Sequence, residues 1–180
     1  KSGLDACDFS VILEQDNHDH DMEYLHGSEK SYTGHHEYTH SHEYPHEHRG
    51  MKEITEIIQK SEMTARAKKM AMRVFGILAQ AESKAHGVPV EEVHFHEVGA
   101  VDSIVDIAAI AICMDNLDIS NVIVPVLYEG TGFIRCQHGQ IPVPVPAVTH
   151  IAETHKLKLK ITDIQGELVT PTGAAVVAAF

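Results

Sequence analysis

The chain has 180 residues, of which 43% are hydrophobic and 22% charged, and its formal net charge is -12 when histidine is counted as neutral. This acidic balance argues against nucleic-acid binding, which relies on clustered Lys and Arg, and no run approaches the roughly 18 apolar residues of a membrane span. Three scattered cysteines without a CxxC pair indicate neither a disulfide framework nor a cysteine zinc site. We therefore expect a soluble, cytoplasmic protein with one globular domain, whose charge suits a cation as ligand.

The two ends of the chain favour a fragment of a longer protein. The first residue is Lys1 rather than Met, and Phe180 ends an apolar run that has no helix stop signal. Near the beginning, the run Phe9–Leu13 is β-prone. Residues 1–14 are therefore predicted to hold a strand that continues a missing N-terminal part.

The composition changes abruptly after this strand. Between Gln15 and His48 the chain has nine histidines and eight acidic residues, but one Leu, one Met and no Val or Ile. Such a segment cannot bury enough apolar surface to fold, so residues 15–50 are predicted to form a disordered arm. Imidazole is a good ligand for Ni, Zn and Cu, and the arm is therefore predicted to bind metal through His18, His20, His26, His35, His36, His40, His42, His46 and His48. The alternative is a low-complexity linker that binds metal incidentally.

Residues 51–180 are predicted to form the globular core. Isoleucines at helical spacing favour a short amphipathic helix from Met51 to near Ser61. A longer helix is predicted to follow, with Ser61 as its N-cap and Gly87 as its stop. Its apolar stripe, which we assign to core packing, consists of Met63, Ala67, Met70, Val74, Leu78 and Ala81.

The rest of the core alternates short extended segments with helices. Extended segments are predicted at Glu92–Glu97, Asn121–Leu127, Phe133–Cys136 and Leu157–Ile161. Helices are predicted at Val101–Leu117, at Pro146–Glu153 and after the turn Thr170–Gly173. The sum is an α+β fold in which helices pack on a modest mixed sheet, with the histidine-rich arm as a disordered insertion.

One stretch, HFHEVGAVDSIVD, carries histidines and carboxylates at regular spacing. In an extended segment His94 and His96 point to one side, so that both imidazoles can contact one ion. Asp102 and Asp106 are four residues apart and share one helix face, and Gly99 permits a tight turn that folds this face towards the imidazoles. The four side chains are predicted to converge on one cation or substrate. The alternative is that Asp102 caps the helix and Asp106 is a buried acid paired with a histidine.

Two small, hydroxyl-bearing turns are candidates for holding the anionic part of a ligand. The second of them opens a predicted helix, whose free N–H groups and dipole favour an anion such as phosphate. Ordinary turn and N-cap chemistry explains each turn at least as well. The candidate binding residues are Gly130, Thr131 and Gly132 in the first turn and Thr170, Thr172 and Gly173 in the second.

The order of these blocks is similar to that of a known family. After the histidine-rich segment come VHFHEVGAVDSIVDI from Val93, GTGFIRCQHGQIPVPVPA from Gly130 and GELVTPTGAA from Gly166. Together they closely resemble the LarC family, the nickel-insertion proteins for pyridinium-3,5-bisthiocarboxylic acid mononucleotide, over nearly everything after Met51. The stretch PVPVPAVTHIAE departs from the family pattern, so no substrate contact is carried over onto residues 144–149.

The resemblance implies a CTP-dependent cyclometallation of the lyase class. In this reaction Ni(II) is placed between two thiocarboxylate sulfurs and bonded to a pyridinium ring carbon, which requires a base to remove a ring proton. His94, His96 and Glu97 are our candidates for this base. Asp102 and Asp106, with His94 and His96, are the candidate nickel ligands or orienting groups.

Cofactors and partners follow from the same resemblance. The expected cofactors are Ni(II) and, in the full-length protein, CTP with a divalent cation. The region associated with CTP binding is expected beyond Phe180, so the fragment alone is predicted to be inactive. The expected partners are the mononucleotide substrate, nickel and a client racemase, in a homo-oligomer without nucleic acid or membrane.

Two other functions are compatible with the same residues. A non-catalytic nickel or zinc storage and delivery module predicts many weak metal sites and no organic ligand. A metal-dependent hydrolase that activates water with His94, His96 and an acid needs an open coordination position on a tightly held ion.

Overall fold

The computed structural model describes residues 49–95, 101–136 and 139–180, with only the backbone of His94. The predicted strand within residues 1–14 and the arm up to His48 lie outside these ranges. The described helices are α1 (Met51–Lys60), α2 (Ala65–His86), α3 (Val101–Asn116), α4 (Pro146–His155) and α5 (Pro171–Ala179), with a 3-10 turn at Val90–Glu92. The described strands are β1 (Arg49–Gly50), β2 (His94–Phe95), β3 (Leu127–Thr131), β4 (Phe133–Cys136), β5 (Gly139–Pro142) and β6 (Leu159–Gln165).

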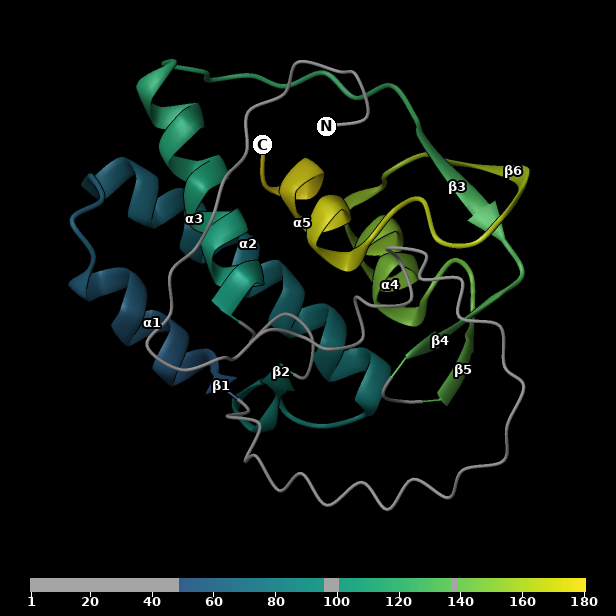
Figure 1. Ribbon diagram of the computed structural model, residues 1–180. Coiled ribbons are helices and arrows are strands. Elements are labelled where there is room, and N and C mark those ends of the chain that lie inside the picture. The colour runs from purple at the N-terminus through teal and green to yellow at the C-terminus, as the bar shows by residue number, and fades with distance from the viewer. Residues whose placement is uncertain (1–48, 96–100, 137–138) are drawn as a thin grey trace, which may run out of the picture.

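The α+β prediction is confirmed, since the described helices pack on small two-stranded sheets (Figure 1). β3 pairs with β6 in parallel, whereas β1 with β2 and β4 with β5 are antiparallel pairs. None of the helices in the described part of the chain is long and apolar enough to cross a membrane.

Helix α2 lies at the centre of the fold, where it contacts α1, α3, α4 and α5. Its predicted apolar stripe packs in the core, with Ala67, Val74, Leu78 and Ala81 buried and Met63 and Met70 partly buried. Phe75 is fully buried and meets Phe95 of β2 edge-on, with ring centroids 6.5 Å apart. The helix ends, as predicted, at Gly87, whose φ of 68° is left-handed.

The N-cap of α2 is Thr64, so the prediction of Ser61 for this position is wrong. Thr64 accepts a hydrogen bond from the backbone N–H of Ala67 at 3.1 Å. Ser61 instead ends α1, because its N–H donates to the carbonyl of Ile57 and its hydroxyl to that of Ile58. Two hydroxyl residues lie between the helices, and each satisfies the end of a different one.

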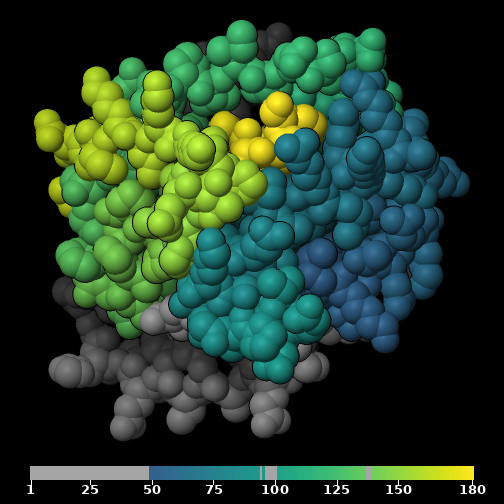
Figure 2. Space-filling view, turned by 180° about the vertical axis from the view of Figure 1, so that it is seen from behind, coloured from purple at the N-terminus to yellow at the C-terminus, as the bar shows by residue number. Residues whose placement is uncertain are grey.

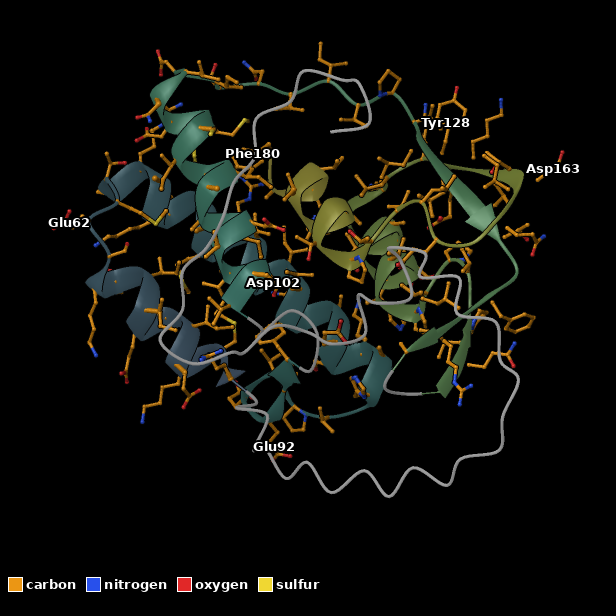
Figure 3. The ribbon with its side chains drawn as sticks, viewed as in Figure 1. Glu62, Glu92, Asp102, Tyr128, Asp163 and Phe180 are labelled. Carbon is orange, nitrogen blue, oxygen red and sulfur yellow. The ribbon has the colours of Figure 1, made fainter. Side chains whose placement is uncertain are left out.

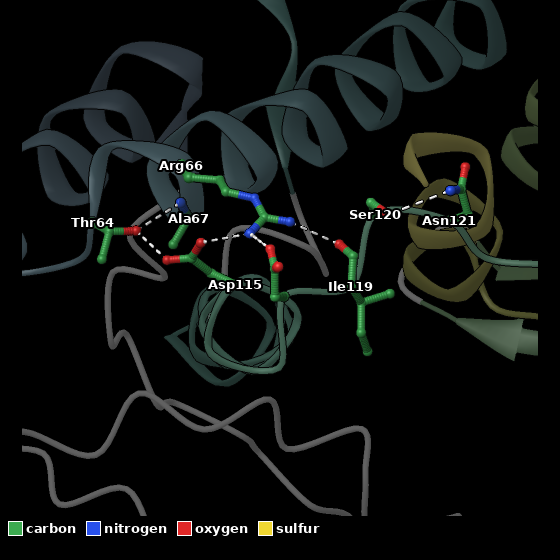
Figure 4. A network of polar contacts seen from close by, with 8 residues as sticks. Thr64, Arg66, Ala67, Asp115, Ile119, Ser120 and Asn121 are labelled. Atoms are coloured by element: carbon green, nitrogen blue, oxygen red, sulfur yellow. Dashed lines mark hydrogen bonds and ion pairs between the residues drawn. The ribbon is translucent and has the colours of Figure 1, made fainter.

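A polar network connects the start of α2 to the end of α3 (Figure 4). Arg66 lies 2.7 Å from the carboxylate of Asp118 and 3.4 Å from that of Asp115, and it donates to the carbonyl of Ile119 at 2.9 Å. The hydroxyl of Thr64 donates to Asp115 as well. Because Arg66 and Asp118 are exposed, these ion pairs fix geometry more than they stabilise the fold.

Helix α5 is a small-residue helix that packs into the core against α2 and α4. Ala174 and Ala175 are fully buried, and Ala179 is nearly so. Seen from behind, only a small gold patch marks the C-terminal residues among the surrounding segments (Figure 2). Its alanines allow α5 to approach α2 and α4 closely.

The strand predicted at Asn121–Leu127 is wrong, because β3 begins where that prediction ends. Pro125 has no N–H to donate to a ladder, and Val122, Ile123 and Val124 are exposed, so this segment has no core to pack against. The strand predicted at Leu157–Ile161 is shifted in the same direction, since β6 continues to Gln165. The predictions for β4 and for the starts of α1, α3, α4 and α5 are confirmed.

Candidate functional site

Strand β1 joins the end of the histidine-rich arm to the HFHE stretch. The two strands are antiparallel, with Arg49 opposite Phe95 and Gly50 opposite His94. Gly50 also donates its N–H to the carboxylate of Glu53 in the first turn of α1, at 3.0 Å. Phe95 is 2% exposed and fixes one side of β2 in the core. Arg49 and Gly50, the last two residues of the predicted arm, are thus held directly beside the backbone of His94.

Asp102 and Asp106 lie in the first two turns of α3, as predicted, and Figure 3 shows Asp102 at the beginning of that helix. The carboxylate of Asp102 accepts a hydrogen bond from the N–H of Ser103 at 2.8 Å. Partial desolvation raises the pKa of Asp106 above its ordinary value, and the nearby charge of Asp102 raises it further. The alternative of Asp106 as a buried acid is wrong, because its side chain is exposed. A nearby cation would offset both effects on Asp106, so this position favours a cation.

The convergence of these carboxylates with the histidines stays a prediction. His96 and Glu97 lie outside the described residues, and so does the side chain of His94. Within the described ranges there is no group of three or more His, Cys, Asp and Glu side chains close enough to hold one metal ion.

The first turn predicted to bind an anion lies at the carboxyl end of β3, next to the residue that follows β6. Gly130 and Thr131 are the last residues of β3, and Gly132 follows with a φ of 95°. The N–H of Gly166, just after β6, donates to the carbonyl of Thr131 at 3.0 Å. A side chain at Gly130 would come within 1.8 Å of the carbonyl oxygen of Gly166, so only glycine fits there. The carboxyl end of parallel strands is where open α/β sheets bind their ligands.

The second turn opens α5, as predicted. Thr170 is the N-cap, and its hydroxyl accepts from the N–H of Gly173 at 3.1 Å. Capping therefore explains Thr170 and Gly173 without a ligand. Within the described part of the chain, the hydroxyls of Thr131 and Thr172 make no hydrogen bond, which leaves one free hydroxyl in each turn.

Sequence reasoning missed Glu129, the residue that connects these turns. Its side chain is 0% exposed. One carboxylate oxygen, Oε1, accepts from the N–H groups of Gly130 at 2.7 Å, Leu168 at 2.8 Å and Val169 at 3.2 Å. The other oxygen, Oε2, is buried without a hydrogen-bond partner. An acidic residue directly before the glycine turn was the available signal, and the predicted strand ended too early to place it in the interior.

Comparison with known proteins identifies relatives of the whole chain. The family model described as nickel insertion protein matches residues 1–180. A pyridinium-3,5-bisthiocarboxylic acid mononucleotide nickel insertion protein of Alkaliphilus metalliredigens is 52% identical over 100% of this chain and 40% of its own length. Proteins of the same name from Clostridium acetobutylicum and Akkermansia muciniphila are 45% and 44% identical, each over 99% of this chain and over 43% and 38% of their own lengths.

The chain spans about two fifths of the length of these curated relatives. No solved structure matches it. The family model covers every residue, and relatives that are 52% and 45% identical to this chain over the aligned residues carry the same name. The chain therefore belongs to the nickel insertion protein family.

Proposed function

We propose that this chain is part of an enzyme that inserts Ni(II) into pyridinium-3,5-bisthiocarboxylic acid mononucleotide by CTP-dependent cyclometallation, a reaction of the lyase class. Membership of the nickel insertion family and the names of the relatives support the substrate and the metal. The structural observation that carries the proposal is the β1–β2 pair, which ties the end of a histidine-rich segment to the backbone of His94.

This pairing gives the arm a role in delivery. Nickel bound by the histidines before Arg49 is tethered to the strand that pairs with β2, and tethering raises the effective concentration of an ion at a neighbouring site without any new contact. A flexible multi-histidine segment binds divalent ions without strong selectivity. The selective step therefore falls to the ordered part of the protein.

Each candidate residue has a task in this reaction. Asp102 and Asp106 hold or orient the incoming cation, since partial desolvation and the charge of Asp102 raise the pKa of Asp106 and a positive ion offsets both effects. An imidazole of His94 or His96, or the carboxylate of Glu97, accepts the ring proton, while the electron pair of the broken C–H bond forms the nickel–carbon bond. A group that titrates near neutrality suits this step best.

The substrate phosphate is assigned to the turns at the ends of β3 and β6, where the free hydroxyls of Thr131 and Thr172 are donors. Binding of CTP with its divalent cation is assigned to the part of the enzyme outside this chain, so the chain alone is expected to be inactive. We further propose a cytoplasmic homo-oligomer that passes its product to a client racemase.

The direct test is to supply the intact protein with Ni(II), CTP and the dithiolated mononucleotide and to record the absorption of the nickel–carbon product. We expect product that depends on all three. Nickel binding without any product would favour the storage and delivery module, which the histidine-rich arm also suits.

Deleting residues 15–48 should leave the fold intact and remove most of the bound Ni(II). The deleted segment has many potential ligands but almost no apolar residues with which to contribute to a core. Calorimetric titration with Ni(II) and circular dichroism measure the two effects. As a control, replacing the nine arm histidines by Gln should cause the same loss of nickel at full chain length. Unchanged nickel stoichiometry would exclude the reservoir, and loss of cooperative unfolding would exclude the arm as a mere linker.

Acidification should release the nickel held by the arm. A protonated imidazole cannot coordinate metal, and its ordinary pKa is about 6.5, so lowering the pH from about 7.5 to about 5.5 converts most arm histidines to the charged form. Equilibrium dialysis at the two pH values measures the release, with the arm deletion as its control. Full retention of nickel at the lower pH would assign the sites to carboxylates instead.

A further inference from the structure

The parallel pair of β3 and β6 is an incomplete sheet. Within the described residues this sheet has two strands, and β6 pairs with β3 alone. Parallel sheets are nearly always covered on both faces, and two strands by themselves are marginally stable at best. Figure 1 shows the pair at the margin of the helices. We propose that the predicted strand at residues 9–13 pairs with the free edge of β6, so that the histidine-rich arm is a loop anchored at both ends.

The apolar side chains of β6 are open to a further strand. Ile161 is 51% exposed and Ile164 is 54% exposed, and Tyr128 on β3 is 55% exposed. In contrast, Glu129 and Gly130 in the middle of β3 are buried. β3 is therefore the inner strand of the pair, and β6 is the strand that still has apolar surface to bury.

The backbone of β6 has hydrogen-bonding groups on its free edge. The N–H of Leu127 donates to the carbonyl of Lys158 at 2.8 Å, so the backbone groups of Lys158 face β3. Because these groups alternate in direction along a strand, those of Leu159 and Ile161 face the opposite edge. Exposed lysines are one way in which proteins block such an edge. Lys158 and Lys160 are exposed, but the two open isoleucines follow them, so the second half of β6 lacks this protection.

The segment of this chain that fits the edge is residues 9–13. Val11 and Ile12 are the only Val and Ile before Arg49, and the apolar residues at positions 9, 11 and 13 share one face of a strand. A single strand needs a sheet to be stable in water. Residues 14–48 span roughly 120 Å when fully extended, whereas a small domain is about 30 Å wide, so their length does not restrict where the strand pairs.

Anchoring at both ends changes how the arm can deliver nickel. β1 holds the end of the arm beside the backbone of His94, and the added strand holds its beginning at β6. Closing a long loop costs little more than closing a short one, and a closed loop keeps its histidines near the surface of the domain. This raises the effective concentration of bound nickel there. The delivery role rests on the proposed function, whereas the strand contact rests on the open edge of β6.

The experiment puts a charge into the added strand and measures protection at the edge of β6. In the intact protein, Val11→Asp places a carboxylate on the apolar face of residues 9–13. Leu25→Asp is the matched control, because it makes the same change of charge within the arm. The measurement is hydrogen exchange at the amides of Leu159 and Ile161, with the amides of α2 as internal reference.

We expect the wild type to protect both amides and Val11→Asp to speed their exchange by about tenfold or more. Exchange in the Leu25→Asp control and in α2 should stay within about threefold of the wild type. Fast exchange at both amides of the wild type would overturn the proposal. Unchanged protection in Val11→Asp would also overturn it: another segment of the intact protein would then cover β6, or a second copy if protection rises with protein concentration.

Replacing Ile164 by Thr tests the same contact from the other side. Threonine keeps the β-propensity of the position but removes apolar surface. If residues 9–13 cover β6, Ile164→Thr should speed exchange at the amide of Ile161 by about fivefold, and by no more in the presence of Val11→Asp than Val11→Asp does alone. Equal effects of Ile164→Thr in the two backgrounds would contradict the contact. If Val11→Asp does not fold, Ile164→Thr decides, and an effect below about twofold overturns the proposal.

Nickel insertion by the same variants separates this inference from the proposed function. We expect Val11→Asp to insert nickel more slowly at limiting Ni(II) and normally at saturating Ni(II). Slow insertion at neither concentration, with the strand detached, would overturn the delivery role. If protection responds as expected but the intact protein never forms product, the insertion function fails and the strand contact is supported. If product forms but protection does not depend on residue 11, the strand contact fails and the insertion function is supported.

Discussion

Replacing Gly130 by Ala should destabilise the protein by about 3 kcal/mol or more, the upper part of the range for overpacking. The added methyl group would lie 1.8 Å from the carbonyl oxygen of Gly166 and 2.8 Å from that of Ile164. Both neighbours are backbone atoms of β6 and the turn after it, so neither can rotate away as a side chain would. Relief requires β3 and β6 to separate, which also stretches the hydrogen bond from Gly166 to Thr131.

Gly76→Ala is the matched control for this substitution. Gly76 lies inside α2, where an added methyl group meets nothing within 4 Å. Because glycine in a helix interior costs about 0.5–1 kcal/mol relative to alanine, the control should be more stable than the wild type. Urea denaturation of the three proteins measures both effects. A Gly130→Ala variant with the midpoint of the wild type would contradict the close approach of β3 to Gly166.

The helices could be predicted because their signals are local. An apolar period of 3.6 residues, Gly87 after α2 and a proline at the first residue of both α4 and α5 are all visible in the sequence. The one misplaced cap has a local reason too. Ser61 and Thr64 are both suitable N-caps, and the choice depends on where α1 ends, which the sequence pattern leaves open.

The strands were harder because their pairing is long-range. The apolar run before Pro125 has high β-propensity, but propensity measures fit to a half-buried sheet, and these side chains are exposed here. The observed strand β3 instead contains Glu129 and Gly130, two residues with low β-propensity. They belong to it because residues about 40 positions later supply two of the three donors to Glu129 and the close backbone contact of Gly130.

The same difference between local and long-range signals holds for the candidate site. The spacing of Asp102 and Asp106 predicted their common helix correctly, because i and i+4 residues share a face. The β1–β2 pair was not predicted, because the two residues Arg49 and Gly50 form no pattern that indicates a strand partner more than 40 positions away. That pairing places the last two residues of the predicted arm beside the first two residues of the HFHE stretch.

Replacing His96 by Ala in the intact enzyme should abolish nickel insertion while leaving the fold and the nickel bound by the arm nearly unchanged. Losing a positioned base typically costs about 10²–10⁴-fold in rate. Losing one weak imidazole ligand among the many of the arm costs almost nothing in bound nickel. The size of the rate effect therefore distinguishes a base or ligand at the reacting centre from one more storage site.

The contacts of Phe95, the residue before His96, support this expectation. Phe95 is buried against Phe75, and Gly50 pairs with His94, so the backbone that leads to His96 is held on two sides. A histidine attached to such a fixed strand loses little entropy when it meets the substrate, which is the condition for an effective base.

His155→Ala is the control for His96→Ala, because His155 lies in the last turn of α4 and has no assigned role in the reaction. Product absorption, Ni(II) titration and thermal unfolding should be measured on both variants. His155→Ala should insert nickel at the wild-type rate. Normal insertion by a folded His96→Ala enzyme would make His96 part of the scaffold, and its loss of nickel from the arm would contradict the separation of storage from chemistry. If His96→Ala fails to fold, its imidazole is a structural hydrogen-bonding partner.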